Sequence, residues 1–101
     1  MNKILLCCAA GMSTSMLVKK MVEAATVSDL DVQINAISIA DIEEQLPHYN
    51  VVLLGPQVKY ELARIEELAR PLNKPVDVIN MMDYGTMRGD KVLQHALSLI
   101  E

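Results

Sequence analysis

The stretch "KILLCCAAGMSTSMLVKKMVEAA", Lys3 to Ala25, predicts the fold because its hydrophobic pattern changes period partway along. Lys3 to Cys8 is a continuous apolar run of the kind found in a strand buried on both faces. From Ser13 onward, apolar residues recur at helical spacing, namely Leu17, Val18, Met21, Val22 and Ala25. The stretch therefore predicts a buried strand, a loop of small residues and a helix.

The rest of the chain repeats this alternation. Asp31 to Ile39 alternates polar and apolar residues and predicts a second strand, followed by a short helix from Asp41 to Leu46 that Pro47 ends. The remaining expected elements are a strand at Val51 to Leu54, a helix from Val58 to Ala69, a strand at Val76 to Ile79 and a helix from Val92 to Ile100. Alternating strands and helices imply right-handed crossovers. We therefore expect an α/β three-layer sandwich, with a four-stranded parallel sheet flanked by helices on both faces.

Length and composition narrow the classes of protein. The 101 residues suffice for one compact domain, expected to span residues 1–101. A formal net charge of −4, with nine scattered Lys and Arg residues, argues against nucleic-acid binding. The longest apolar run, Ile4 to Ala10, is far too short to cross a membrane, and no signal-peptide pattern precedes it. A cytoplasmic location without membrane insertion is expected.

Three segments are expected to meet where the strands end, which is where parallel sheets bind ligands. They are Cys7 to Ser15, Gly55 to Gln57 and Met81 to Gly89. The first has the parts of an anion cradle: Gly11 and its small neighbours let backbone N–H groups approach a ligand, and Ser13 can cap the helix. The positive end of the helix dipole also favours an anion. These features predict a phosphate-binding loop.

A cysteine facing such a cradle has its thiolate stabilised and is a nucleophile for phosphorus. A phosphatase loop requires an arginine six residues after the cysteine. That position holds Ser13 when counted from Cys7 and Thr14 when counted from Cys8. Neither register gives a phosphatase loop, so the pattern favours phosphocysteine chemistry without an arginine clamp.

Metal and dithiol chemistry fit the sequence poorly. Redox and zinc C-x-x-C motifs need a spacer that the adjacent Cys7 and Cys8 lack, and neighbouring residues do not form an ordinary disulfide. His48 and His95 lie on separate predicted elements. We therefore expect no metal and no cofactor.

Four segments in this order resemble the enzyme IIB component of the sugar phosphotransferase system, lactose/cellobiose (chitobiose) family. They are "CAAGMSTS" (Cys8 to Ser15), "VVLLGPQ" (Val51 to Gln57), "NKPVDVI" (Asn73 to Ile79) and "YG" (Tyr84 and Gly85). The resemblance covers nearly the whole chain. It implies a phosphotransferase in which Cys8 accepts a phosphoryl group from a phosphohistidine of the IIA component. Cys8 then passes the group to a sugar, expected to be a β-linked disaccharide, that the membrane IIC component binds.

The rest of the site follows from the loop pattern and from the segments expected at the strand ends. The expected phosphate-binding residues are Ala9, Ala10, Gly11, Met12, Ser13, Thr14 and Ser15, and the expected walls are Gly55, Pro56, Gln57, Tyr84 and Gly85. Backbone N–H groups without an arginine suit a carrier, because an arginine clamp together with a positioned water would favour hydrolysis.

Cys7 departs from the family pattern, which has an apolar residue there, and is expected to be a buried small side chain that points away from Cys8. Two other classes stay open: a non-catalytic regulatory module that holds an anion in the same loop, and a phosphatase-like enzyme.

Overall fold

A four-stranded parallel sheet forms the centre of the protein. The structure, a computed structural model, describes residues 2–9 and 12–100, without the side chains of residues 12–14. The strands are β1 (Asn2–Cys8), β2 (Val32–Ser38), β3 (Val51–Leu54) and β4 (Val76–Val78), in the order β2-β1-β3-β4. The predicted strands are confirmed, and no predicted strand end differs from the observed one by more than one residue.

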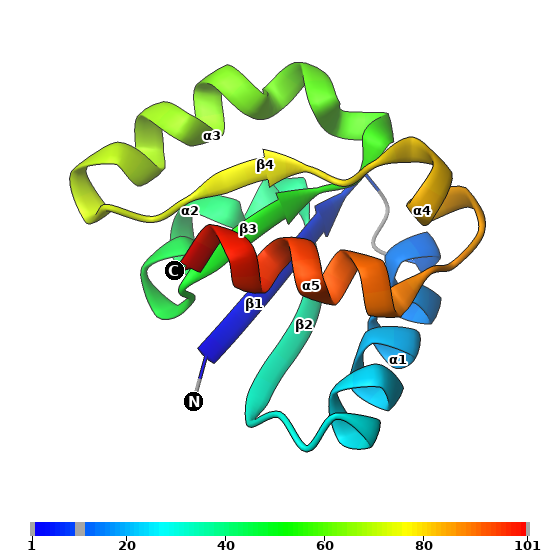
Figure 1. The fold of residues 1–101 in the computed structure, drawn as a ribbon. Coiled ribbons are helices and arrows are strands. Elements are labelled where there is room, and N and C mark those ends of the chain that lie inside the picture. The colour runs from blue at the N-terminus through cyan, green and yellow to red at the C-terminus, as the bar shows by residue number, and fades with distance from the viewer. Residues whose placement is uncertain (1, 10–11, 101) are drawn as a thin grey trace.

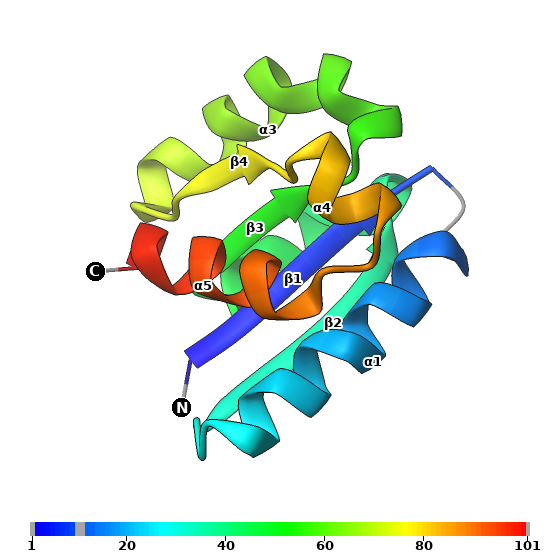
Figure 2. The same cartoon turned by 45° about the vertical axis from the view of Figure 1, so that its right-hand side comes forward.

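Helices cover both faces of the sheet. The α-helices are α1 (Met12–Val27), α2 (Ile42–Gln45), α3 (Leu62–Ala69), α4 (Met81–Gly85) and α5 (Gly89–Ile100), and the short 3-10 helices are η1 (Ile39–Asp41), η2 (Leu46–His48), η3 (Pro56–Glu61) and η4 (Arg70–Leu72). Helices α1 and α5 cover one face, and α2 and α3 cover the other (Figures 1 and 2). The expected three-layer sandwich is confirmed. Within the part of the chain that the structure describes, no helix is long and apolar enough to span a bilayer.

Strand β1 supplies both halves of the core because its side chains alternate between the two faces. Ile4 and Leu6 pack against α1 and α5, whereas Leu5 and Cys7 pack against α2 and α3. Residues 4–8 are all buried, as the continuous apolar run predicts for a central strand covered on both faces.

Two predicted details of the helices were wrong. The α-helix α2 ends at Gln45, but Pro47 does not end the helical segment, which continues as η2 to His48. Pro47 lies in the first turn of η2, where the backbone N–H that proline lacks is not needed for a helical hydrogen bond. The segment after β4, expected to be a loop, contains α4, which Asn80 caps by accepting hydrogen bonds from the N–H groups of Met82 and Asp83. A single helical turn has too few residues to show a hydrophobic period.

Gly89 allows α5 to begin directly against α1. A Cβ atom at this position would lie 2.4 Å from the carbonyl carbon of Lys20 and 2.6 Å from the backbone nitrogen of Met21. Both neighbours are backbone atoms of α1, so no side chain could move aside to make room. The close approach of these two helices therefore depends on glycine at residue 89.

Candidate functional site

The four strands end at one edge of the sheet and bring the predicted segments together. Cys8 pairs in register with Ser38, and Cys7 with Leu54. The N–H of Gly55 donates to the carbonyl of Cys7 at 2.8 Å. The N–H of Ile79 likewise donates to the carbonyl of Leu54 at 2.8 Å. The segments after β1, β3 and β4 therefore begin side by side, as the parallel sheet predicts.

The two thiols occupy different surroundings. Cys7 is fully buried on the α2 and α3 face, where burial first, and the charge of Cys8 second, raise its pKa from 9.0 to about 12. Cys8 is the last residue of β1, and strand alternation places its side chain on the opposite face, with Leu6. Cys7 is therefore a packed core residue, and Cys8 is the thiol at the strand ends.

Most of the predicted phosphate-binding loop lies outside the described residues. Ala9 is exposed directly after β1, and Ser15 is exposed in the first turns of α1. Ala10 and Gly11 are not among the described residues, nor are the side chains of Met12, Ser13 and Thr14. Helix α1 begins at Met12, so Ser13 lies in its first turn rather than before it. The helix terminus is close in sequence to Cys8, whereas the amide cradle itself stays a prediction.

Gly55 and Gln57 form the wall next to Cys8. A Cβ atom on Gly55 would lie 3.4 Å from Cys8 Cβ and 2.9 Å from Gln57 Oε1, so the backbone approaches Cys8 closely here. Pro56 begins η3, where its fixed φ suits a helical start. Gly55 and Gln57 therefore lie near Cys8, and their role as a wall of the site stays a prediction.

Tyr84 is connected to Gln57 by a hydrogen bond between α4 and η3. Gln57 Nε2 donates to the hydroxyl oxygen of Tyr84 at 3.2 Å. The Tyr84 ring packs in the core cluster on the α1 and α5 face, and the residue is 9% exposed. Gly85 ends α4 and is exposed, and a Cβ there would meet no atom within 4 Å. Tyr84 is therefore joined to Gln57, whereas the roles of Tyr84 and Gly85 as walls of the site stay predictions.

The sequence analysis missed two polar residues at this edge. Ser38 ends β2 and pairs in register with Cys8, and its hydroxyl accepts a hydrogen bond from the N–H of Ala40 at 3.3 Å. Asn80 caps α4. Ser38 caps η1 from the end of β2, and Asn80 caps α4 two residues after β4, so a cap-type residue near a strand end is the signal that could have identified them.

The two histidines lie on elements other than β1, which carries the two cysteines. His95 on α5 interacts with Asp77 on β4, with 2.9 Å between His95 Nε2 and Asp77 Oδ2, and His48 is exposed at the end of η2. Among the residues described, no three side chains of His, Cys, Asp or Glu come together as metal ligands would. The described residues therefore offer no group of side chains on which a metal site could be proposed.

Comparison with known proteins identifies the family. Residues 3–95 match the family described as "PTS system, Lactose/Cellobiose specific IIB subunit". The chain is 49% identical over 102 residues to the galactose-specific EIIB component of Lactococcus lactis subsp. cremoris, covering 96% of this chain and 94% of the relative. It is 40% identical over 100 residues to the oligo-beta-mannoside-specific EIIB component of Bacillus subtilis, covering 99% and 97%.

Solved structures agree with this result. The cellobiose-specific IIB component of Borrelia burgdorferi superposes with a TM-score of 0.82 at 42% identity, covering 98% of this chain and 91% of that one. The lactose-specific IIB domain of Streptococcus pneumoniae superposes with a TM-score of 0.90 at 22% identity, covering 99% and 98%, and supports the fold alone. The chain belongs to the lactose/cellobiose-specific IIB family of the sugar phosphotransferase system and is a phosphotransferase.

Proposed function

We propose that the chain carries a phosphoryl group on the sulfur of Cys8, between a phosphohistidine of a IIA component and a sugar bound by a membrane IIC component. The observation that carries this proposal is the position of Cys8. It ends β1 at the edge where three loops begin, shortly before the start of α1. The other thiol, Cys7, fits the role less well, because it packs among core side chains on the α2 and α3 face, where burial raises its pKa to about 12.

The reaction consists of two displacements at phosphorus. The Cys8 thiol first loses its proton, and the thiolate then attacks the phosphorus of phosphohistidine, so that a P–N bond breaks as the P–S bond forms. In the second step a sugar hydroxyl loses its proton and attacks the same phosphorus, and the Cys8 thiolate leaves. Backbone N–H groups of residues 9–15 are proposed to hold the transferring group in both steps.

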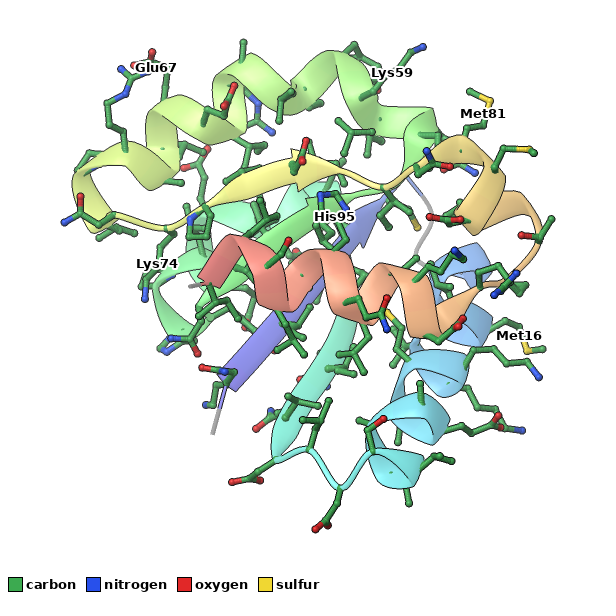
Figure 3. All side chains as sticks on the ribbon, viewed as in Figure 1. Met16, Lys59, Glu67, Lys74, Met81 and His95 are labelled. Carbon is green, nitrogen blue, oxygen red and sulfur yellow. The ribbon has the colours of Figure 1, made fainter. Side chains whose placement is uncertain are left out.

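The surface around the strand ends suits docking of protein partners. Met16, Tyr60, Met81 and Met82 are between 53% and 76% exposed. Figure 3 shows Met16 and Met81 projecting from the side of the molecule at which the strands end, with Glu67 and Lys74 at the opposite side. Exposed methionines adapt to more than one partner surface, which suits a carrier that meets a donor and an acceptor in turn. Contact with IIC would bring a cytoplasmic chain to the membrane.

The proposed class of sugar is supported by relatives that are named for cellobiose, galactose and oligo-β-mannosides. We propose a β-linked disaccharide as the acceptor, and a single IIB domain over residues 1–101.

Intact-mass measurement after mixing with a phosphorylated IIA component separates the three classes considered. A gain of one phosphoryl group supports the carrier. An unchanged mass supports an anion-binding module, and release of inorganic phosphate supports a phosphatase. Formation of sugar phosphate with IIC-containing membranes then tests the second step.

A further inference from the structure

We propose that the side-chain amide of Gln57 donates a hydrogen bond to the phosphoryl group on Cys8, and that Tyr84 is the positioning residue for this amide. The inference deepens the proposed phosphocysteine function and rests on it. It assigns two side chains to a step otherwise attributed to backbone N–H groups alone.

The amide of Gln57 contacts Tyr84 and lies near Cys8. Its Nε2 bonds to the Tyr84 hydroxyl at 3.2 Å, while its Oε1 lies 2.9 Å from the point that a Gly55 Cβ would occupy. That same point is 3.4 Å from Cys8 Cβ. The amide oxygen and Cys8 Cβ therefore both border the space that a side chain on Gly55 would fill.

Tyr84 can hold the amide in either of two orientations. A tyrosine hydroxyl both donates and accepts, so it can accept from Nε2 or donate to Oε1. The terminal torsion of glutamine is soft, and Gln57 is exposed, so a half turn of the amide is easy. The Tyr84 ring is fixed in the core, so the hydroxyl stays in place while the amide turns.

Phosphorylation of Cys8 would select the second orientation. In the structure Oε1 is the end of the amide that lies beside Gly55, the residue that also borders Cys8, and an oxygen there would repel a phosphoryl dianion. After a half turn, Nε2 donates toward the phosphoryl oxygens and Oε1 accepts from Tyr84. A neutral amide donates without the full positive charge of an arginine, which suits a group that must leave again.

The test compares rates at which Cys8 accepts phosphate from a phosphorylated IIA component of a cellobiose-specific system. Gln57→Glu keeps the shape but replaces the donor with a carboxylate, and Gln57→Ala removes the side chain. Gln94→Glu, at an exposed position on α5, is the control for the same change in charge. Both positions are exposed, so the three variants are expected to fold, which circular dichroism checks.

We expect Gln57→Glu to accept phosphate about tenfold or more slowly than wild type near pH 8, since a charged hydrogen bond is replaced by repulsion. Gln57→Ala should be intermediate, and Gln94→Glu should match wild type. Between about pH 8 and pH 5 the rate of Gln57→Glu relative to Gln57→Ala should rise, because a protonated carboxyl donates again. The two variants differ only at residue 57, so any effect of pH on the rest of the protein cancels in the ratio of their rates.

Two results would overturn the contact. One is a rate of phosphoryl acceptance in Gln57→Glu equal to that in Gln94→Glu. The other is a rate in Gln57→Glu that is never lower than that in Gln57→Ala, or a ratio of these two rates that does not change with pH. If wild type accepts no phosphate at all, the proposed function fails instead.

The role of Tyr84 is tested by a double-mutant cycle. Tyr84→Phe keeps the ring in the core and removes the hydroxyl, and it should slow acceptance by a few-fold in wild type. In the Gln57→Ala background it should have no further effect, because Tyr84 acts through the amide. An equal effect in both backgrounds would overturn the positioning role.

Discussion

Cys7 and Cys8 are adjacent in sequence, yet Cys7 should be almost inert, and Cys8→Ser isolates it as the sole thiol. Burial on the α2 and α3 face is the main cause that raises its pKa from 9.0 to about 12. Three pKa units leave about a thousandth of the usual thiolate at neutral pH. Because the thiolate is the species that iodoacetamide alkylates, native Cys8→Ser should react about a thousandfold more slowly than the same protein unfolded in urea.

Quenched alkylation followed by peptide mass spectrometry measures both rates. The native rate is measured at pH 7 and 8, both below the two pKa values, so native and unfolded rates should each rise with pH while the gap of about a thousandfold stays constant. A native rate within about tenfold of the unfolded rate would refute the reasoning, because Cys7 would then have to be solvated.

The same pKa shift makes stability depend on alkaline pH. The unfolded thiol titrates near 9.0 and the folded thiol near 12, so the unfolded chain loses its proton first. The contribution of Cys7 to the free energy of unfolding is therefore complete below pH 9. It falls by about 1.4 kcal/mol per pH unit as the pH rises toward 12. Urea unfolding of wild type and Cys7→Ala over this window should show the difference between them shrinking, and a constant difference would contradict the shift.

Four further substitutions test the packing, the cap of α4 and the loop. Gly89→Ala should lower the free energy of unfolding by about 2 to 3 kcal/mol, because its Cβ would overlap the backbone of α1. Gly85→Ala, whose Cβ meets no atom within 4 Å, should change it by less than about 1 kcal/mol, and equal losses in urea unfolding would contradict this account. Asn80→Ala should cost about 1 kcal/mol by removing the cap of α4, and an unchanged melting temperature would show that the cap contributes nothing. Gly11→Val should slow phosphoryl transfer far more than it lowers stability, because misplaced N–H donors matter more than about 1 to 3 kcal/mol of loop strain; unchanged transfer would exclude the amide cradle.

Local patterns were enough to predict most of the fold. The four-residue run Val51 to Leu54 is a strand with those bounds, and Cys7 is the buried core residue that the apolar run predicts. Such features depend on neighbours in sequence. Helix α4 was missed because one turn shows no period, and its signal was the cap residue Asn80.

Contacts between distant segments could not be predicted in the same way. The hydrogen bond between Gln57 and Tyr84 joins residues 27 positions apart, and the sequence does not record the rotamers that bring them together. The contact of Gly89 with α1 depends on how two helices cross. In the site, sequence reasoning identified Gln57 and Tyr84 as wall residues, but only the structure shows that they bond to each other.

The central claim is that Cys8 is the residue that receives the phosphoryl group. The most direct measurement maps the added phosphate by peptide mass spectrometry after brief reaction with a phosphorylated IIA component, in wild type, Cys8→Ser and Cys7→Ala. We predict one phosphoryl group on Cys8 in wild type and in Cys7→Ala, and none in a folded Cys8→Ser. Phosphate on Cys7, on a histidine or on a loop hydroxyl, or undiminished labelling of Cys8→Ser, would contradict the assignment.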